Sequence, residues 1–319
     1  MKTAIITGIT GQDGAYLSTL LLKNDYKVIG LVRNDQPNLT GLDYLKIKEH
    51  VEIVKCNLLD IEQTETVLKK YSPDEIYNLA AQSSVSISFE QPIATFQFNT
   101  LSVFNLLESI KTINRSIRFY QASSSEMCGK VNQLPITEDS VLHPLSPYAT
   151  SKVAAHFTCT NYRESYGMYI ACGILFNHES YLRSNGFFVK KVIRESIQLH
   201  LGNKTHLEVG NIDIKRDFGY SPLYVEAMYK MLQQETPADY LVCSGESISL
   251  RKIIYYVFSV LGISNDKCVV NPKLYRPNEI ENIYGDNAKA KRELDWKYDY
   301  NFYQVLDLLI AEEQANLNK

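Results

Sequence analysis

A tyrosine and a lysine near the middle of the chain have a spacing that suits acid and base chemistry at a hydroxyl group. In the segment Ser146-Pro-Tyr-Ala-Thr-Ser-Lys152, Ser146 is predicted to cap a helix and Pro147 to take its first position. Tyr148 and Lys152 then lie one turn apart on the same helix face. An ammonium and a helix N-terminus both favour a phenolate, so the pair is predicted to deprotonate a substrate hydroxyl. Lowering the tyrosine pKa from about 10 to about 7 requires roughly 4 kcal/mol.

A hydroxyl and a carboxylate precede this pair in the sequence. Apolar and aromatic residues at Ile117, Phe119 and Tyr120 predict a strand that ends at Ala122. This prediction puts Ser124 and Glu126 on the loop after it. A Tyr-x-x-x-Lys spacing alone is a weak signal. Together with Ser124, Glu126 and a nucleotide-binding signature upstream, it predicts a catalytic site.

That upstream signature opens the chain. Residues 3 to 7 predict a buried strand, followed by Gly8, Gly11 and Gly14 and then by an amphipathic helix. Glycines at these positions let the backbone turn tightly and approach a pyrophosphate at the helix N-terminus. The Gly-x-x-Gly-x-x-Gly spacing is looser than that of standard dehydrogenases, but the strand and helix around it predict dinucleotide binding.

The residue after the second predicted strand indicates which dinucleotide binds. The strand from 27 to 32 ends before Arg33, where enzymes specific for NAD usually have an acidic residue. A guanidinium at this point can hold the 2′-phosphate of NADP. The sequence therefore favours NADP, although Asp35 lies close by.

Strands and helices alternate along the first half of the chain, which predicts an α/β fold with a Rossmann-type doubly wound parallel sheet and right-handed crossovers. Beyond it we expect a smaller, mostly α C-terminal substrate lobe. The predicted domains are 1–178, with about 213–243 returning to it, and 179–319. Further strands are predicted at 51–56, 75–80, 168–175 and 240–243, and helices at 60–70, 92–111, 188–201, 225–233, 250–261 and 302–315.

Composition sets ordinary limits on function. The chain has 319 residues, 45% hydrophobic, and a formal net charge of -3, which does not indicate a nucleic-acid partner. No apolar run has the length of a membrane span, and the N-terminus enters a strand directly, so we expect a cytoplasmic protein. The six cysteines lack the paired spacing of a zinc site; we expect reduced, structural thiols and no metal.

Seven segments resemble one known family. The chain is similar over essentially its whole length to the GDP-mannose 4,6-dehydratases, which are extended short-chain dehydrogenase/reductase proteins. The matching segments are Ile6-Thr-Gly-Ile-Thr-Gly-Gln-Asp-Gly-Ala-Tyr16, Tyr77-Asn-Leu-Ala-Ala-Gln-Ser83, Arg118-Phe-Tyr-Gln-Ala-Ser123, Gly173-Ile-Leu-Phe-Asn-His-Glu-Ser180, Lys215-Arg-Asp217, Tyr224-Val-Glu-Ala-Met228 and Tyr275-Arg-Pro277.

The resemblance implies a hydro-lyase that carries out an internal redox cycle on a GDP-sugar. It places the catalytic roles on Ser124, Glu126, Tyr148 and Lys152. Hydride leaves C4 for a tightly bound NADP that is regenerated in each turnover, water is lost across C5 and C6, and the hydride returns to C6.

The resemblance also implies a set of ligand-binding residues. Cofactor-binding residues are Gly8, Thr10, Gly11, Gln12, Asp13, Gly14, Arg33, Asn57, Leu58, Leu79, Ala80, Ala81, Ser83, Tyr148, Lys152, Leu175, His178 and Arg183. Substrate-binding residues are Ser84, Glu126, Asn177, Lys191, Arg216, Arg276 and Glu279. Lys191, Arg216 and Arg276 together have the chemistry to bind the second diphosphate, that of the GDP-sugar.

The chain departs from the family pattern at several positions. Ser124 stands where the family has threonine, and Asn57 where an aspartate usually meets the adenine. The arginine-rich loop, which in the family reaches the neighbouring subunit's cofactor, is rewritten here, and only Arg183 persists. We therefore expect a homodimer, with a tetramer as the alternative. The changes also leave open a GDP-sugar other than GDP-mannose, such as GDP-manno-heptose.

Three other functions compete with the dehydratase. A GDP-4-keto-sugar reductase or epimerase needs Tyr148 and Lys152 but no carboxylate such as Glu126 to remove a C5 proton. A non-catalytic NADP sensor needs only the glycine loop, which the complete set of catalytic side chains argues against. An ordinary alcohol dehydrogenase would exchange its cofactor freely.

Overall fold

The computed structural model describes residues 1–317. In these residues, seven strands form a parallel sheet in the order β10-β6-β5-β4-β1-β2-β3. The order reverses between β1 and β4, and ligands bind at such a switch point, outside the carboxyl ends of the strands. The strands are β1 (Thr3–Thr7), β2 (Lys27–Val32), β3 (Val51–Lys55), β4 (Glu75–Asn78), β5 (Arg118–Ser124), β6 (Ile170–Leu175) and β10 (Asp239–Val242).

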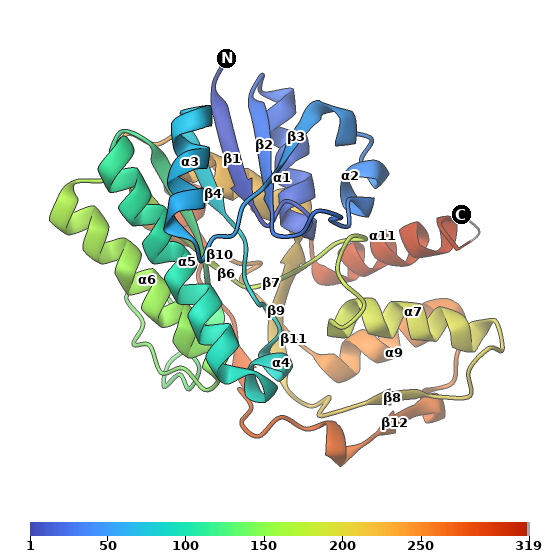
Figure 1. The fold of residues 1–319 in the computed structure, drawn as a ribbon. Helices are drawn as coiled ribbons and strands as arrows, with labels where there is room; N and C mark the ends of the chain where they lie inside the picture. The colour runs from blue at the N-terminus through green and yellow to red at the C-terminus, as the bar shows by residue number, and fades with distance from the viewer. Residues whose placement is uncertain (318–319) are drawn as a thin grey trace.

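Helices cover both faces of this sheet (Figure 1). On one face, α1 and α8 pack on a core that includes Ile6, Tyr77 and Tyr120. On the other, α3, α5 and α6 pack on Ile5 and Phe119, because successive strand residues point to opposite faces. The helices are α1 (Gln12–Lys23), α2 (Thr40–Tyr44), α3 (Ile61–Tyr71), α4 (Val85–Glu90), α5 (Pro92–Ile113), α6 (Pro147–Tyr166), α8 (Ser221–Met231) and α10 (Ala288–Leu294), with short 3-10 turns at Lys48–His50 and Ser125–Met127.

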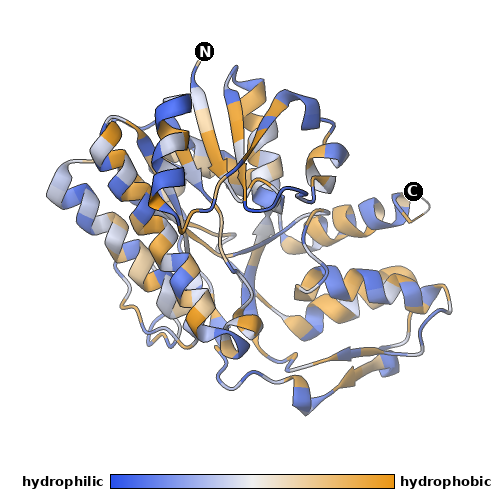
Figure 2. Cartoon of the chain, in the orientation of Figure 1, coloured by the Kyte–Doolittle hydropathy of each residue, from blue (hydrophilic) through white to orange (hydrophobic). Residues whose placement is uncertain are grey.

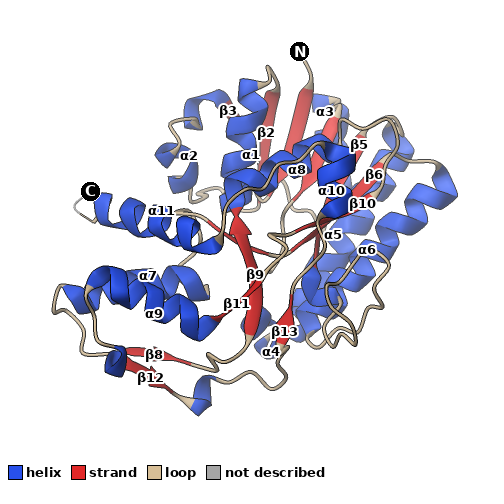
Figure 3. Cartoon of the chain, turned by 180° about the vertical axis from the view of Figure 1, so that it is seen from behind, coloured by secondary structure: helices blue, strands red, loops and turns tan. Residues whose placement is uncertain are grey.

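The second part of the molecule is a lobe with its own hydrophobic core. It is built around three helices, α7 (Phe188–His200), α9 (Leu250–Leu261) and α11 (Phe302–Ala315). Figure 3 shows a small sheet between this lobe and the large sheet. Its strands are β7 (Asn177–Glu179), β9 (Lys215–Tyr220), β11 (Ser247–Ser249) and β13 (Asn282–Ile283), while β8 (Leu207–Val209) pairs with β12 (Cys268–Val270), near the 3-10 turns Asn265–Lys267 and Pro272–Leu274.

Hydropathy explains this layering. The central strands are largely hydrophobic, whereas the helices alternate between hydrophobic and hydrophilic residues (Figure 2). Strands that are covered on both faces need apolar residues throughout, and a helix that packs on one side needs only an apolar stripe. The two hydrophobic cores, one on each face of the sheet, form where the apolar strands meet the apolar stripes of the helices.

The predicted α/β architecture is confirmed, and four details differ from the sequence-based expectations. β5 extends to Ser124, so this residue ends the strand instead of lying on the loop. The short lobe strands were not expected, since three-residue strands carry too little pattern to detect. Within the stretch 179–319, α10 packs against β10 and α8 of the first domain, and Trp296 is buried in the same core.

Further expectations concern cysteines, membranes and metals. All six cysteines are free thiols, and five of them are buried. Across residues 1–317, none of the helices has the length and apolar character needed to cross a membrane. The same residues contain no cluster of three or more His, Cys, Asp or Glu side chains that could hold a metal ion.

Candidate active site

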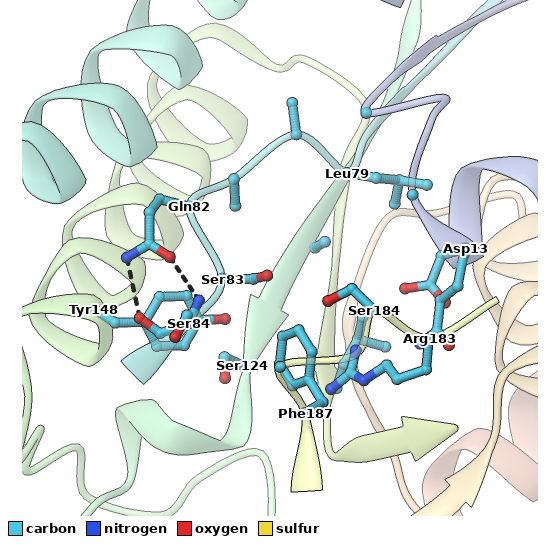
Figure 4. Close-up of a pocket in the computed structure, with 18 of the residues that line it drawn as sticks. Asp13, Leu79, Gln82, Ser83, Ser84, Ser124, Tyr148, Arg183, Ser184 and Phe187 are labelled. Atoms are coloured by element: carbon cyan, nitrogen blue, oxygen red, sulfur yellow. Dashed lines mark hydrogen bonds between the residues drawn. The ribbon is translucent and has the colours of Figure 1, made fainter. Parts of the chain in front are cut away.

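A cavity of about 1110 Å³ lies at the carboxyl ends of β1, β4 and β5 and extends to the lobe. Figure 4 shows Tyr148, Ser124, Ser83 and Ser84 on one side of it and Arg183, with Ser184 and Phe187, on the other. Of the predicted site residues, all but Asn57, Lys191 and Glu279 line this cavity. The topology therefore brings together the glycine loop, the catalytic helix and the lobe.

The glycine loop needs glycine for a different reason at each position. Gly8 has a φ of +73°, and a Cβ there would lie 2.8 Å from the backbone nitrogen of Ala80. A Cβ on Gly14 would lie 2.5 Å from the carbonyl oxygen of Gly8. Gly11 is the N-cap of α1 and offers no side-chain cap, so the helix N-terminus faces the cavity with free backbone donors. This cradle fits the pyrophosphate of a dinucleotide.

The end of the cavity after β2 has the charge expected for NADP. Arg33 is exposed and lines the cavity. Asp35, an acidic residue that would disfavour a 2′-phosphate, instead forms an ion pair of 2.7 Å with Lys55 and does not line the cavity. Its position therefore does not argue against NADP. Leu58 lines the cavity, but the side-chain oxygen of Asn57 accepts from the Leu59 backbone at 3.2 Å.

Two predicted cofactor residues, Asp13 and His178, also join α1 to β7 and α8. His178 Nε2 lies 2.8 Å from Asp13 Oδ2, and Ser221 donates to Asp13 Oδ1 at 2.8 Å. Burial raises the pKa of Asp13, but His178 and Ser221 outweigh burial, so the pKa is lowered. Gln12 donates to the His178 backbone carbonyl at 2.8 Å and completes the joint.

The catalytic helix forms as predicted, but its charges are arranged differently. Ser146 caps α6 by accepting from Ala149 at 3.1 Å, and Pro147 is the first helical residue. Lys152 does not bond to Tyr148: its Nζ donates to the Ala122 carbonyl at 2.7 Å and lies 5.9 Å from the centre of the Tyr148 ring. Burial lowers the pKa of Lys152 to about 8.

The expectation of a phenolate favoured by Lys152 is therefore corrected. Burial raises the pKa of Tyr148 to about 12, and Glu126 adds to the rise. A hydrogen bond with Ser124 and the charge of Arg183 act in the opposite direction. Because desolvation outweighs these effects, the Tyr148 hydroxyl keeps its proton in this structure. Arg183, held flat on the Phe187 ring at 3.6 Å, is the cation that acts on it.

Glu126 lies on the 3-10 turn that follows β5, and its backbone N–H donates to Ser124 Oγ at 3.3 Å. Its carboxylate is partly exposed to the cavity. The negative charge of Glu126 contributes to the raised pKa of Tyr148, and it opposes the lowering of the Arg216 pKa by burial. The carboxylate thus lies between the catalytic helix and the lobe.

Two lobe arginines converge on one carboxylate. Arg216 is buried, and its Nη1 donates to the carbonyls of Ile280 at 2.5 Å and Lys215 at 2.8 Å. Arg216 and Arg276 lie 3.4 Å and 3.5 Å from Glu279 Oε1. Backbone carbonyls and Glu279 therefore orient both guanidiniums at the edge of the cavity.

Lys191 does not belong to this set. Its ammonium donates to the Glu208 backbone carbonyl at 2.7 Å, and the residue does not line the cavity. We correct the prediction that it binds phosphate: the helix α7 directs it towards β8 instead.

Several lining residues were missed. Gln82 exchanges hydrogen bonds of 2.6 Å and 3.0 Å with the Ser84 backbone, which shapes the loop after β4 (Figure 4). The apolar side chains Phe188, Ile214 and Leu250 line the lobe end of the cavity. Gln82 could have been predicted, because it lies in a segment that matches the family. The three apolar residues could not, because an isolated apolar residue in a sequence cannot be distinguished from a core residue.

Comparisons with known proteins agree with this geometry. Residues 5–309 match the family described as GDP-mannose 4,6 dehydratase. GDP-mannose 4,6 dehydratase 1 of Arabidopsis thaliana is 40% identical over 324 residues, covering 98% of this chain and 90% of that protein. RMD from Pseudomonas aeruginosa, complexed with NADPH, superposes with a TM-score of 0.83 at 25% identity, covering 99% of this chain and all of that one. DesIV of Streptomyces venezuelae, a dTDP-glucose 4,6-dehydratase with NAD and TYD bound, has the same fold, with a TM-score of 0.89 at 19% identity and coverage of 99% and 98%. The chain belongs to the GDP-mannose 4,6-dehydratase family.

Proposed function

We propose that this protein is a GDP-mannose 4,6-dehydratase that converts GDP-mannose to GDP-4-keto-6-deoxymannose. Family membership over nearly the whole chain supports this function. The observation that carries the proposal is a second base: Glu126 shares one cavity with Tyr148 and Lys152. A reductase or a C4 epimerase needs no carboxylate there.

NADP is the cofactor. The glycine cradle of α1 fits its pyrophosphate, and Arg33 at the far end of the cavity suits its 2′-phosphate. The bound cofactor would supply a hydride acceptor for C4 and then a hydride donor for C6, with C5 regaining a proton equivalent to the one lost from the C4 hydroxyl, so the reaction would have no net redox change. Lys152 is proposed to hold the nicotinamide ribose.

At C4 of the sugar, Tyr148 is proposed to lose its own proton to solvent first, and the phenolate then takes the proton of the hydroxyl group. Its pKa of about 12 in the protein alone means that the proton transfer needs help from nearby donors and cations. Ser124 and Arg183, which both lower the Tyr148 pKa, are proposed to supply that help. Ser124 also holds the oxygen that becomes the ketone.

At C5 and C6, Glu126 performs the elimination. The 4-ketone makes the C5 proton acidic, and Glu126 removes it. The C6–O bond then breaks, and the leaving hydroxyl departs as water with the proton that Glu126 received. Position favours this role, because Glu126 lies two residues beyond Ser124, which contacts the Tyr148 hydroxyl.

The GDP moiety is proposed to bind at the lobe end. Arg216 and Arg276 have the planar forks that bind phosphate oxygens in pairs, and Glu279 orients both. Ser84 and Asn177 line the cavity and are proposed to contact the sugar. With a cofactor domain of 1–178 and about 213–243 and a substrate lobe of 179–319, Arg276 and Glu279 come from the lobe, whereas Arg216, Ser84 and Asn177 come from the cofactor domain.

The protein is further proposed to be a homodimer formed through α5 and α6. Residues 92 to 107 of α5 include no charged side chain, although Phe96, Leu101 and Phe104 are exposed. Phe157 on the adjacent α6 is 56% exposed. An uncharged apolar face of this kind is typical of a contact between copies. Sedimentation of the wild type and of Phe104→Glu with Phe157→Glu tests this; a wild-type monomer would refute it. A cytoplasmic location stays a prediction.

The function is tested by incubating the purified protein with GDP-mannose, and separately with GDP-manno-heptose, without added cofactor. Mass spectrometry should detect loss of one water from GDP-mannose. Dehydration of only the heptose would transfer the assignment to that sugar. No dehydration of either, by protein that retains NADP, would overturn the proposal.

A further inference from the structure

A buried polar chain runs from the catalytic strand to the edge of the sheet. His156 lies on α6, one turn after Lys152 and two after Tyr148, and is buried against β5. Its Nδ1 is 2.9 Å from the hydroxyl of Ser123, the residue immediately before Ser124. The histidine therefore reaches the end of the catalytic strand from the catalytic helix.

On its other side, His156 faces an acidic group. Nε2 lies 3.8 Å from Asp239 Oδ2 on β10, and Arg163 of α6 holds that carboxylate with two hydrogen bonds of 2.7 Å and 3.0 Å. From β6, the thiol of Cys172 also faces the ring and contacts the thiol of Cys159 on α6. Burial lowers the pKa of His156, but Cys172 and Asp239 outweigh burial, so the pKa is raised.

Two ties thus join α6 to consecutive residues of β5. Lys152 bonds to the Ala122 carbonyl, and His156 bonds to the Ser123 side chain. The next residue, Ser124, makes the hydrogen bond that lowers the pKa of Tyr148. Because a small shift between catalytic groups costs much of their effect, these ties determine how well Ser124 meets Tyr148.

We propose that His156 is a positioning residue of the dehydration reaction, which fixes the end of β5 on α6 through Ser123 and Asp239 and so aligns Ser124 with Tyr148. This inference rests on the proposed function. The tie persists in both charge states of the ring. A neutral ring with its proton on Nε2 accepts from the Ser123 hydroxyl, whereas an imidazolium donates to that hydroxyl from Nδ1 and forms an ion pair with Asp239, 3.8 Å from Nε2. The second arrangement is charge-assisted and stronger.

Kinetics of four variants and one control variant test the proposal. Ser123→Ala and His156→Phe should each lower kcat about tenfold while KM for GDP-mannose stays within about twofold, since they change alignment and not binding. The double variant should be no worse than either single one, because both remove the same bond. His156→Asn, whose amide takes the place of Nδ1, should restore most of kcat. Asn161→Ala, on the exposed face of α6, is the matched control and should behave as the wild type.

The pH profile separates a positioning role from a merely structural one. In the wild type, kcat should fall severalfold as pH rises through the titration of His156, above the ordinary histidine value of about 6.5. His156→Asn should lack this fall. Additive effects of Ser123→Ala and His156→Phe, or an unchanged profile in His156→Asn, would overturn the proposal.

A measurement without substrate distinguishes failure of this proposal from failure of the proposed function. NMR titration of the His156 ring in the holoenzyme should give a raised pKa that changes in Ser123→Ala and in Asp239→Asn. A ring that titrates identically in all three proteins contradicts the tie, whether or not GDP-mannose is the substrate. Unfolding midpoints of the variants check that each one folds.

Discussion

The two walls of the cavity are built in different ways. The cofactor wall is made mainly by backbone. A Cβ atom on Gly8 or Gly14 would collide with other main-chain atoms, and the N-terminus of α1 at Gly11 has no side-chain cap. The lobe wall is made by side chains: Arg216 and Arg276 are oriented by carbonyls and by Glu279.

This difference predicts different behaviour. A wall of close-packed backbone cannot accept added atoms, and its backbone atoms do not titrate. A wall of charged side chains can rearrange to suit another sugar nucleotide, but it depends on pH and on each ion pair. The following experiments test the contrast, beginning with the carboxylate that lies between the walls.

Glu126→Gln should give the largest effect. Without a base for the C5 proton, dehydration should fall by about 100-fold or more, which is typical of the loss of general base catalysis. Oxidation at C4 should continue, so reduced cofactor accumulates on the enzyme under substrate. Absorbance of the reduced nicotinamide and product analysis measure both. Dehydration at the wild-type rate would remove Glu126 from the mechanism.

Gly14→Ala tests the cofactor wall. The new Cβ would lie 2.5 Å from the Gly8 carbonyl oxygen and 2.7 Å from Ile9 Cα, so the backbone must shift. We expect a loss of about 3 kcal/mol in stability together with loss of bound NADP. Gly186→Ala is the matched control, because Gly186 also lines the cavity but has nothing within 4 Å of its Cβ position. Equal behaviour of the two variants would contradict the contrast.

Asp217, which follows Arg216 on β9 and lies behind the cavity surface, tests the pH dependence of the structure that supports the lobe wall. This buried carboxylate accepts from the Ser244 hydroxyl at 2.7 Å and from the Gly245 backbone at 3.0 Å, yet burial raises its pKa from 3.8 to about 6. A raised pKa means that the stability contribution is complete below pH 3.8 and is lost as pH rises through 6, by roughly 3 kcal/mol. Unfolding free energies of the wild type and of Asp217→Asn should therefore diverge between these values. A constant difference would show that Asp217 is ionised throughout.

Arg33→Ala tests how the cofactor wall chooses its ligand. NADP should weaken by about 2 kcal/mol, the typical strength of a hydrogen bond to a charged group, while NAD is little affected. Titration of the apoprotein with each dinucleotide gives the answer. Equal losses would mean that Arg33 is only a surface charge.

Arg216→Ala and Arg276→Ala give the smallest predicted effect. Each should raise the KM for GDP-mannose about tenfold, or about 1.4 kcal/mol, and leave NADP affinity unchanged. Lys191→Ala should change neither constant, because its ammonium bonds to the Glu208 carbonyl. Titration of free GDP against the variants is the direct measurement, and similar affinity for all would place the diphosphate elsewhere.

The sequence by itself determined the elements whose signals are local. The glycines after β1, the Ser146 and Pro147 start of α6, and the one-turn spacing of Tyr148 and Lys152 each depend on a few consecutive residues, and each is found in the structure. The alternation of apolar strands and amphipathic helices likewise predicted the parallel sheet, because its central strands β1, β4, β5 and β6 are almost wholly buried, whereas the edge strand β3 is partly exposed.

Only the tertiary structure decided which charges meet. The sequence placed Lys152 beside Tyr148, but the ammonium bonds to Ala122 and the cation that acts on Tyr148 comes from Arg183 on the lobe. Lys191 and Arg216 looked alike as lobe cations, and both donate to backbone carbonyls, yet only Arg216 lines the cavity. The physical reason is that desolvation and ion pairing depend on groups distant in sequence, which no local pattern records.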